Sequence, residues 1–196
     1  KLDAFVKKGG RLLLTGESGL DEDGRLMFDA GCEVESPSEV SPDFVLPIKP
    51  LRPDFVDSPM VMYTSSKRVK VTDGESLGDV YDNYFNRTWD HFCSHQHAPN
   101  KPRKSGYVFG SCKNNISYLG HNVFTNYRAY GAVAYRQVLT NLIRRLLDDQ
   151  PTVTTNMPST ARAVLNQQKD HNRHVLHLLY ANTISRGGPV ELSGGT

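Results

Sequence analysis

Short runs of apolar residues, most of them closed by glycine, proline or asparagine, recur along the chain and predict a series of short elements. The run at residues 12–14 lies between Gly10 and Gly16 and is typical of a strand buried on both faces. About two turns of amphipathic helix precede it and end at a glycine pair. Because helix, glycine pair and buried strand form half of a βαβ unit, we expect a parallel sheet here.

The clearest helix is predicted over residues 132–148, where apolar positions recur at helical spacing. Its apolar stripe consists of Tyr135, Val138, Leu139, Leu142 and Leu146. Arginine and glutamine side chains lie mostly off this stripe, and Pro151 ends the pattern. The pattern therefore predicts an amphipathic helix with one packed face and one polar face.

The remaining elements are predicted to be short strands. Between residues 36 and 59, six prolines exclude a long helix. The character of the chain changes after residue 151, where strand-like runs flank a polar turn. We predict an α/β domain at residues 1–150 and a small β-rich C-terminal segment at residues 151–196. The predicted strands are at residues 44–46, 61–63, 68–71, 106–110, 116–120, 152–155, 162–166 and 173–180.

Composition narrows the classes of partner. The 196 residues carry a net charge of +2, and no basic run exceeds a few residues, so we expect no nucleic-acid partner. No apolar run approaches the length of a membrane span, so we expect no membrane partner either. Three widely spaced cysteines predict no disulfide framework and leave the cellular compartment open.

Residues 84–99 are the most unusual segment of the chain. They hold its only tryptophan, three of its seven histidines and one of its three cysteines, without any helical repeat. Polar and aromatic side chains crowded into a connecting segment are costly to fold unless they are paired or used. We expect residues 87–97 to form the functional surface, at an interface or in contact with sugar. The candidate contact residues are Arg87, Trp89, His91, His95 and His97.

A metal site in the same segment is the alternative. His91, Cys93, His95 and His97 alternate, so on an extended chain all four would point to one side. Imidazole and thiolate are good ligands for zinc or copper. Structural zinc sites usually use two separated pairs, and no second pair is spaced in that way. We therefore predict no metal and no cofactor, and keep these four residues as the alternative ligand set.

No catalytic residue is predicted in this chain. Residues 110–114 hold Cys112 but lack the second glycine of a nucleophile elbow. The acidic residues offer no distinctive pair for glycoside hydrolysis. We interpret Cys32 and Cys112 as small apolar fillers.

Several segments resemble a known domain. Residues 5–16 with 18–20, residues 84–95, and residues 156–162 leading into 174–180 resemble the β-galactosidase trimerisation-type domain of glycoside hydrolase family 42 and related bacterial glycosyl hydrolases. The resemblance implies a flavodoxin-like, class I glutamine amidotransferase-like fold. That fold is an α/β three-layer sandwich, here without its first strands, and it carries no amidotransferase chemistry. The small C-terminal β appendage would follow it.

The same resemblance implies a function. The chain would be a non-catalytic accessory and oligomerisation domain of a β-galactosidase-like glycoside hydrolase in carbohydrate metabolism. It would support subunit assembly, as trimers in relatives, and line the active site of a catalytic barrel upstream in the same polypeptide. The alternatives are a stand-alone hydrolase or metal-binding enzyme that uses residues 91–97, and a carbohydrate-binding module. The bacterial resemblance leaves both cytoplasm and periplasm open as locations.

Overall fold

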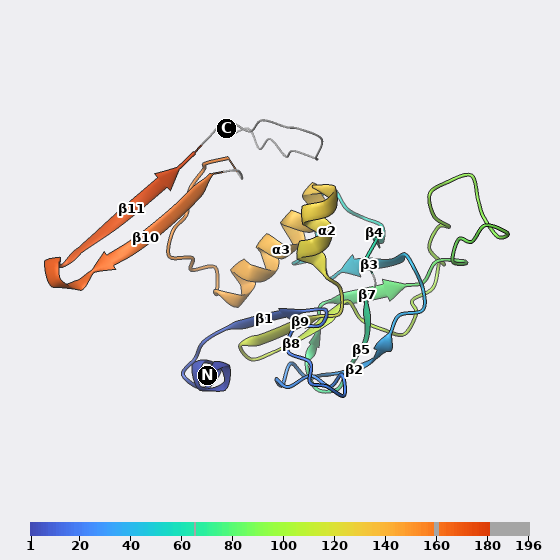
Figure 1. Ribbon diagram of the computed structural model, residues 1–196, viewed down its shortest axis with the longest axis horizontal. Helices are drawn as coiled ribbons and strands as arrows, with labels where there is room; N and C mark the ends of the chain where they lie inside the picture. Colours follow the sequence, from blue (N-terminus) through green and yellow to red (C-terminus); the bar gives the residue numbers. More distant parts are fainter. Residues whose placement is uncertain (65, 159–160, 181–196) are drawn as a thin grey trace.

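A computed structural model describes residues 1–64, 66–158 and 161–180, and within them the chain forms short elements joined by long connections (Figure 1). The helices are α1 (Leu2–Lys7), α2 (Val123–Tyr130), α3 (Val133–Leu146) and the 3-10 turn η1 (Lys169–His171). The strands are β1 (Leu12–Thr15), β2 (Cys32–Pro37), β3 (Asp43–Pro47), β4 (Met60–Met62), β5 (Lys67–Val71), β6 (Glu75–Ser76), β7 (Gly78–Tyr81), β8 (Gly110–Lys113), β9 (Ile116–Leu119), β10 (Arg162–Gln168) and β11 (Arg173–Leu179).

In the described residues these strands form four small sheets. Their orders are β1-β9-β8-β6, β4-β3-β7, β2-β5 and β10-β11. Only β1 and β9 run parallel, with Leu12 opposite Ile116 and Thr15 opposite Leu119. All other pairs in this part of the chain are antiparallel. The sheets are therefore built mainly from neighbouring strands and hairpins.

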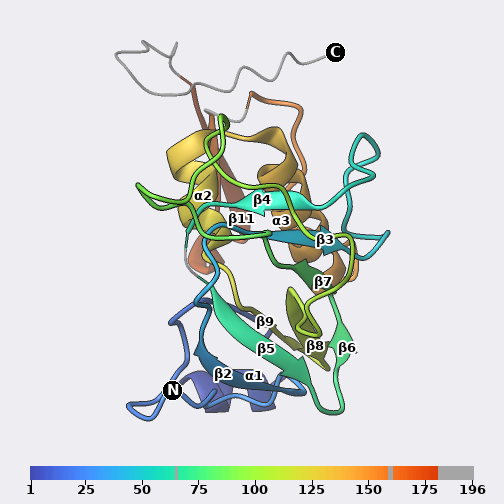
Figure 2. The same ribbon diagram turned by 90° about the vertical axis from the view of Figure 1, so that its right-hand side faces the viewer.

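The expected flavodoxin-like, amidotransferase-like three-layer sandwich is wrong. Such a fold needs a mostly parallel sheet with helices on both faces, whereas the described part has one parallel pair and three short helices. Helices α2 and α3 follow each other directly and lie on one side of the β1–β9 pair (Figure 2). The other side is covered by the β2–β5 sheet and by Val6 of α1. The buried run at residues 12–14 misled the expectation. It forms β1, an edge strand of a mixed sheet, but apolar side chains cover both of its faces, so the run is as apolar as a strand of a parallel sheet.

Two apolar clusters lie on opposite faces of the β1–β9 pair. Leu13 and Leu119 face the larger cluster, which includes the apolar stripe of α3. Leu14 and Tyr118 face the smaller cluster beside β5. Because alternate residues of a strand point to opposite faces, this pair is buried on both sides. Because the apolar stripe of α3 packs in the larger cluster, the packed face predicted from its amphipathic pattern is confirmed.

A buried polar cluster joins three of the sheets. The carboxylate of Asp43 at the start of β3 accepts hydrogen bonds from the Ser66 hydroxyl at 2.7 Å and lies 2.8 Å from Nε2 of His121. Ser66 immediately precedes β5, and His121 follows β9 by two residues. Asp43 and His121 are each only 1% exposed. Burial of such polar groups is tolerated when they are hydrogen-bonded, and here the Asp43 carboxylate pairs with Ser66 and with Nε2 of His121, while Nδ1 of His121 has no partner in the described part of the chain.

Several predicted elements are confirmed. Helix α3, strand β1 and the strands at β3, β4, β5, β9, β10 and β11 lie where the sequence predicts them, within a few residues. The sequence analysis predicts no helix at α2, which ends at Gly131 in the left-handed conformation. It also misses β2, β6 and β7, which are short or carry prolines and polar residues. Two predicted strands are wrong: residues 152–155 form no strand, and the strand predicted at 106–110 overlaps β8 only at Gly110.

The β10–β11 hairpin stands away from the other sheets (Figure 1). Its two strands pair in register from Arg162 opposite Leu179 to Gln168 opposite Arg173. Among the described residues it shares no sheet with any other strand. The division at residues 150 and 151 stays a prediction, and the end of the predicted C-terminal segment, residues 181–196, lies outside the described residues.

We expect Asp43→Ala to destabilise the fold by about 3 kcal/mol, because it leaves two buried polar side chains without their shared acceptor. Urea unfolding followed by far-UV circular dichroism measures the free energy of unfolding. Asp57→Ala, at an exposed position, is the matched control and should change it by less than about 0.5 kcal/mol. Equal effects of the two substitutions would contradict the structural role of the cluster.

Candidate functional site

Residues 84–99, here called the aromatic loop, leave the sheets after β7 and return before β8 (Figure 1). The two ends of the loop are held together. The backbone N–H of Tyr84 donates to the carbonyl of Pro99 at 3.1 Å, and Asn83 and Asn100 form an antiparallel bridge. The loop therefore closes on itself at a narrow neck, as compact surface loops with functional roles often do.

The side chain of Asn86 fastens one strand of the loop to the segment before β3. Its amide nitrogen donates to the carbonyl of Glu39 at 2.7 Å. Its amide oxygen accepts from the backbone N–H of Ser41 at 2.8 Å and from the Asn83 side chain at 3.2 Å. Sequence reasoning missed this role, because an asparagine side chain that imitates backbone hydrogen bonding can be recognised only once its partners are known.

His97 fastens the other strand of the loop. Its ring makes edge contacts with Phe44 at 5.5 Å and Tyr63 at 5.7 Å between ring centroids. Tyr63 in turn lies 4.6 Å from the ring of Tyr130 at the end of α2. The next residue, Ala98, is fully buried. His97, predicted as a contact residue, therefore belongs to the base of the loop.

Local hydrogen bonds shape the outer part of the loop. The Thr88 hydroxyl accepts from the backbone N–H of His91 at 3.1 Å and donates to the Asp90 carboxylate at 2.7 Å. This hydroxyl lowers the pKa of Asp90 below its usual range. The His91 ring stacks on Phe85 at 3.9 Å. The outer turn is thus folded without support from the rest of the protein.

Arg87 also works within the loop. Its guanidinium donates to the carbonyl of Gln96 at 3.2 Å and so connects the two sides of the loop. We expected Arg87 and His91 to supply hydrogen bonds to a partner. The structure places both in contacts that hold the shape of the loop, with their remaining donors exposed.

The tip of the loop presents apolar side chains to solvent. Trp89 is 90% exposed and Phe92 is 66% exposed, and Tyr84 at the neck is also exposed. His95 is exposed beside them. Burial of a large aromatic side chain lowers the free energy. A group of exposed aromatic side chains therefore marks a candidate interaction site. Of the five predicted contact residues, the structure leaves Trp89 and His95 most available to a partner.

The alternative metal site is not formed in this structure. The alternative ligand set required His91, Cys93, His95 and His97 to point to one side, as they would on an extended chain. The segment turns instead, so that His91 stacks on a ring within the loop and His97 lies in its base. Residues 1–64, 66–158 and 161–180 contain no group of three or more histidine, cysteine or acidic side chains able to hold a metal ion.

The other two cysteines pack as predicted. Cys32 and Cys112 lie against the two apolar clusters on either face of the β1–β9 sheet. Burial and, to a lesser extent, the nearby charge of Asp29 raise the pKa of Cys32 to about 11. A thiol with so high a pKa is a poor nucleophile at neutral pH.

Comparisons with known proteins point to carbohydrate-active enzymes. No family model and no curated protein sequence matches this chain. An α-L-fucosidase isoenzyme 2 from Paenibacillus thiaminolyticus matches with a TM-score of 0.85 and 33% identity, over 97% of this chain and 29% of that one. A β-galactosidase from Rahnella sp. R3 matches with a TM-score of 0.51 and 14% identity, over 84% of this chain and 22% of that one.

The chain therefore resembles a domain of glycoside hydrolases. This agrees with the part of the sequence resemblance that connects the chain with glycoside hydrolases in general. It spans less than a third of the length of either enzyme. The second similarity concerns the fold alone. None of the helices in the described part of the chain has the length and apolar character that crossing a lipid bilayer requires.

Asn86→Ala should loosen the aromatic loop, because it removes three hydrogen bonds that fix one side of the neck. Trp89 is the only tryptophan, so its fluorescence reports on this loop alone. We expect a lower fluorescence anisotropy of Trp89 with little change in the free energy of unfolding. Asn166→Ala, on the β10–β11 hairpin, is the control; an unchanged anisotropy in Asn86→Ala would contradict the proposed anchoring.

Cys32 should react slowly with iodoacetamide at pH 8, about 100-fold more slowly than a free cysteine thiol, because only the thiolate attacks. With a pKa raised to about 11, the thiolate fraction rises about tenfold per pH unit from pH 8 to 10. Peptide mass spectrometry after timed labelling follows this residue separately from Cys93. A labelling rate that levels off near pH 9 would show that the pKa is not raised.

Proposed function

We propose that this chain is a non-catalytic accessory domain of a glycoside hydrolase, and that its aromatic loop docks on another part of the enzyme. The docking surface is the catalytic barrel, of the same polypeptide or of a neighbouring subunit, at the rim of its active site. The observation that carries the proposal is Trp89, 90% exposed at the tip of a loop whose base is fixed by Asn86 and His97.

The energetics favour a contact of this kind. Burying a tryptophan removes roughly 150 Å² or more from water, which at about 25 cal/mol per Å² is worth about 4 kcal/mol. A loop already held in shape loses less conformational entropy on binding than a flexible one. Aromatic anchors of this type dominate the binding energy of many interfaces.

The side chains of the loop divide into two groups in this proposal. Trp89 and Phe92 enter the partner, and His95 supplies a hydrogen bond at the edge of the contact. Arg87 and His91 keep the tip in shape through Gln96 and Phe85. Loss of Trp89 should therefore weaken docking more directly than loss of His91.

Two comparisons support a glycosidase context. The chain matches part of an α-L-fucosidase and part of a β-galactosidase, and in each case it covers only a minor share of the enzyme. A domain of this size beside a larger remainder fits an accessory role. Assembly into trimers, the β-galactosidase trimerisation-type identity and a catalytic barrel upstream remain part of the proposal, carried by the sequence resemblance alone.

The decisive experiment uses the complete gene product. Trp89→Ala should lower kcat/KM on the cognate nitrophenyl glycoside about tenfold or more, or shift the protein to a smaller oligomer in sedimentation velocity. Trp89→Phe should retain part of either property. Met27→Ala, another exposed apolar residue, is the matched control and should change neither.

Unchanged activity and unchanged oligomeric state in Trp89→Ala would overturn the docking role of the loop. A complete gene product without a barrel-sized region of repeated βα units would overturn the accessory role itself. The carbohydrate-binding alternative replaces docking if the fluorescence emission maximum of Trp89, measured in this chain alone, shifts when galactose or fucose is added. That result would show that the loop binds sugar directly.

A further inference from the structure

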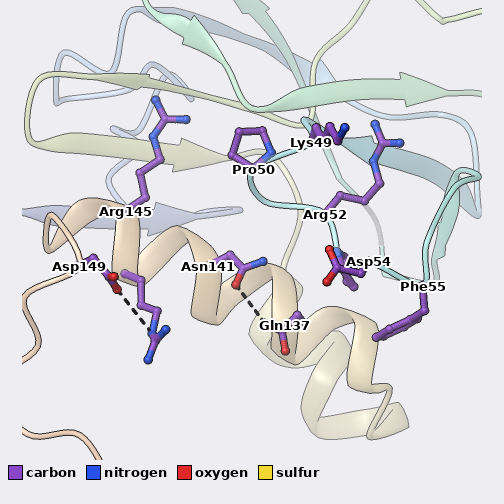
Figure 3. A pocket seen from close by; sticks show the side chains of 11 residues that line it. Lys49, Pro50, Arg52, Asp54, Phe55, Gln137, Asn141, Arg145 and Asp149 are labelled. Atoms are coloured by element: carbon purple, nitrogen blue, oxygen red, sulfur yellow. Dashed lines mark hydrogen bonds and ion pairs between the residues drawn. The ribbon is translucent and has the colours of Figure 1, made fainter.

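A hollow of about 660 Å³ lies between helix α3 and the connection from β3 to β4 (Figure 3). It shares no residue with the aromatic loop. One wall is the polar face of α3, and the other is formed by residues 49–55. This volume is in the range of sites that hold small organic ligands.

Two amide side chains on α3 face the hollow (Figure 3). Gln137 donates to the amide oxygen of Asn141 at 3.0 Å, and Asn141 donates to the carbonyl of Leu51 at 3.2 Å. These bonds fix the orientation of both amides. They also leave the Gln137 oxygen and one N–H of each amide for a ligand, since each amide group has two donor hydrogens.

The opposite wall carries two positive charges that are not held in ion pairs among the described residues. Arg52 uses its Nε to donate to the carbonyl of Pro47 at 3.2 Å, which orients the guanidinium. In the described part of the chain, neither Arg52 nor Lys49 forms an ion pair with a carboxylate. A guanidinium and an ammonium that line the same hollow are suited to binding carboxylate or sulfate groups.

The two arginines of α3 that line this hollow, unlike Lys49 and Arg52, are paired with carboxylates. Arg145 pairs with Glu75, and Arg144 lies 3.8 Å from Asp149. Their charges are therefore largely balanced within the protein. The charges of the hollow that are not held in an ion pair within the described part of the chain are the two cations Lys49 and Arg52 and the one carboxylate Asp54, at the opposite wall, which leaves a net positive charge there.

Phe55 adds an apolar surface at one end of the hollow (Figure 3). Its side chain is 66% exposed, although the hollow offers a place where its ring could be covered. Asp54, beside it, offers acceptor oxygens for hydroxyl groups. An aromatic face next to fixed amides and a carboxylate provides both stacking and hydrogen bonding for a pyranose ring.

We propose that this hollow is a binding site for an anionic saccharide, one that carries a carboxylate or a sulfate group. Lys49 and Arg52 bind the anionic group, Gln137 and Asn141 bind hydroxyls, and Phe55 packs against the sugar ring. A free inorganic anion would use only the two cations, and a neutral sugar would leave both of them unused. The inference does not depend on the docking role of the aromatic loop.

The test is a titration of the ¹⁵N-labelled chain followed by its amide and side-chain NMR signals. The probes are D-galacturonic acid and galactose 6-sulfate, with galactose and sodium sulfate as the neutral and ion-only comparisons. We expect the two anionic sugars to shift the side-chain amide signals of Gln137 and Asn141. They should bind about tenfold or more tightly than either comparison, because each unbalanced cation adds a charge-assisted hydrogen bond.

Substitutions separate the contributions. Lys49→Gln and Arg52→Gln should each weaken binding of the anionic sugars about tenfold, and Phe55→Ala should weaken binding of the sugars but not of sulfate. Arg25→Gln, an exposed arginine outside the hollow, is the control and should leave the affinity unchanged. Because Lys49 makes no side-chain hydrogen bond or ion pair within the described part of the chain, Lys49→Gln keeps the test valid if Arg52→Gln misfolds.

Three outcomes would overturn the proposal. Galactose binding as tightly as its 6-sulfate would show that the cations take no part. Sodium sulfate binding as tightly as the sugar would reduce the site to an adventitious ion. Absence of shifts at Gln137 and Asn141 would show that no saccharide enters the hollow.

Discussion

The fold depends on one buried carboxylate. Asp43 accepts hydrogen bonds from Ser66 and His121, and these three residues belong to the starts or ends of strands in three different sheets. The β2–β5 sheet has too few strands to be stable alone, and the mutual arrangement of all three sheets must come from contacts between them. A buried acceptor shared by two donors is specific in a way that apolar packing is not, because any other arrangement leaves polar groups unpaired.

The same strand connects this cluster to the aromatic loop. Phe44 follows Asp43 on β3, so its side chain points to the opposite face of the strand. There it contacts His97 at the base of the loop. The segment just before β3 receives the hydrogen bonds of Asn86. Strand β3 and the segment before it therefore connect the buried polar cluster to the neck of the loop. The tip with Trp89 stays outside the core. This combination of a fixed base and an apolar tip makes the loop suited to docking.

The sequence resemblance and the structure agree on the class of protein and disagree on the fold. Both connect the chain with glycoside hydrolases. The resemblance also implied a parallel, helix-covered sheet, and the described residues instead form small, mostly antiparallel sheets. Local signals could not reveal this, because whether β1 pairs with a near or a distant strand depends on β9, about 100 residues along the chain.

By itself the sequence determined the elements with strong local patterns: the amphipathic stripe of α3, the buried run of β1, the β10–β11 hairpin, and the segment that carries Trp89. Periodicity and composition act between near neighbours, so they are readable without a fold. Only the tertiary structure decided that His91 and His97 turn away from each other, that Asn86 anchors the loop, and that Gln137, Asn141 and Arg52 meet at one hollow. These relations join residues far apart in the chain, and they exist only once long-range packing has brought their backbones together.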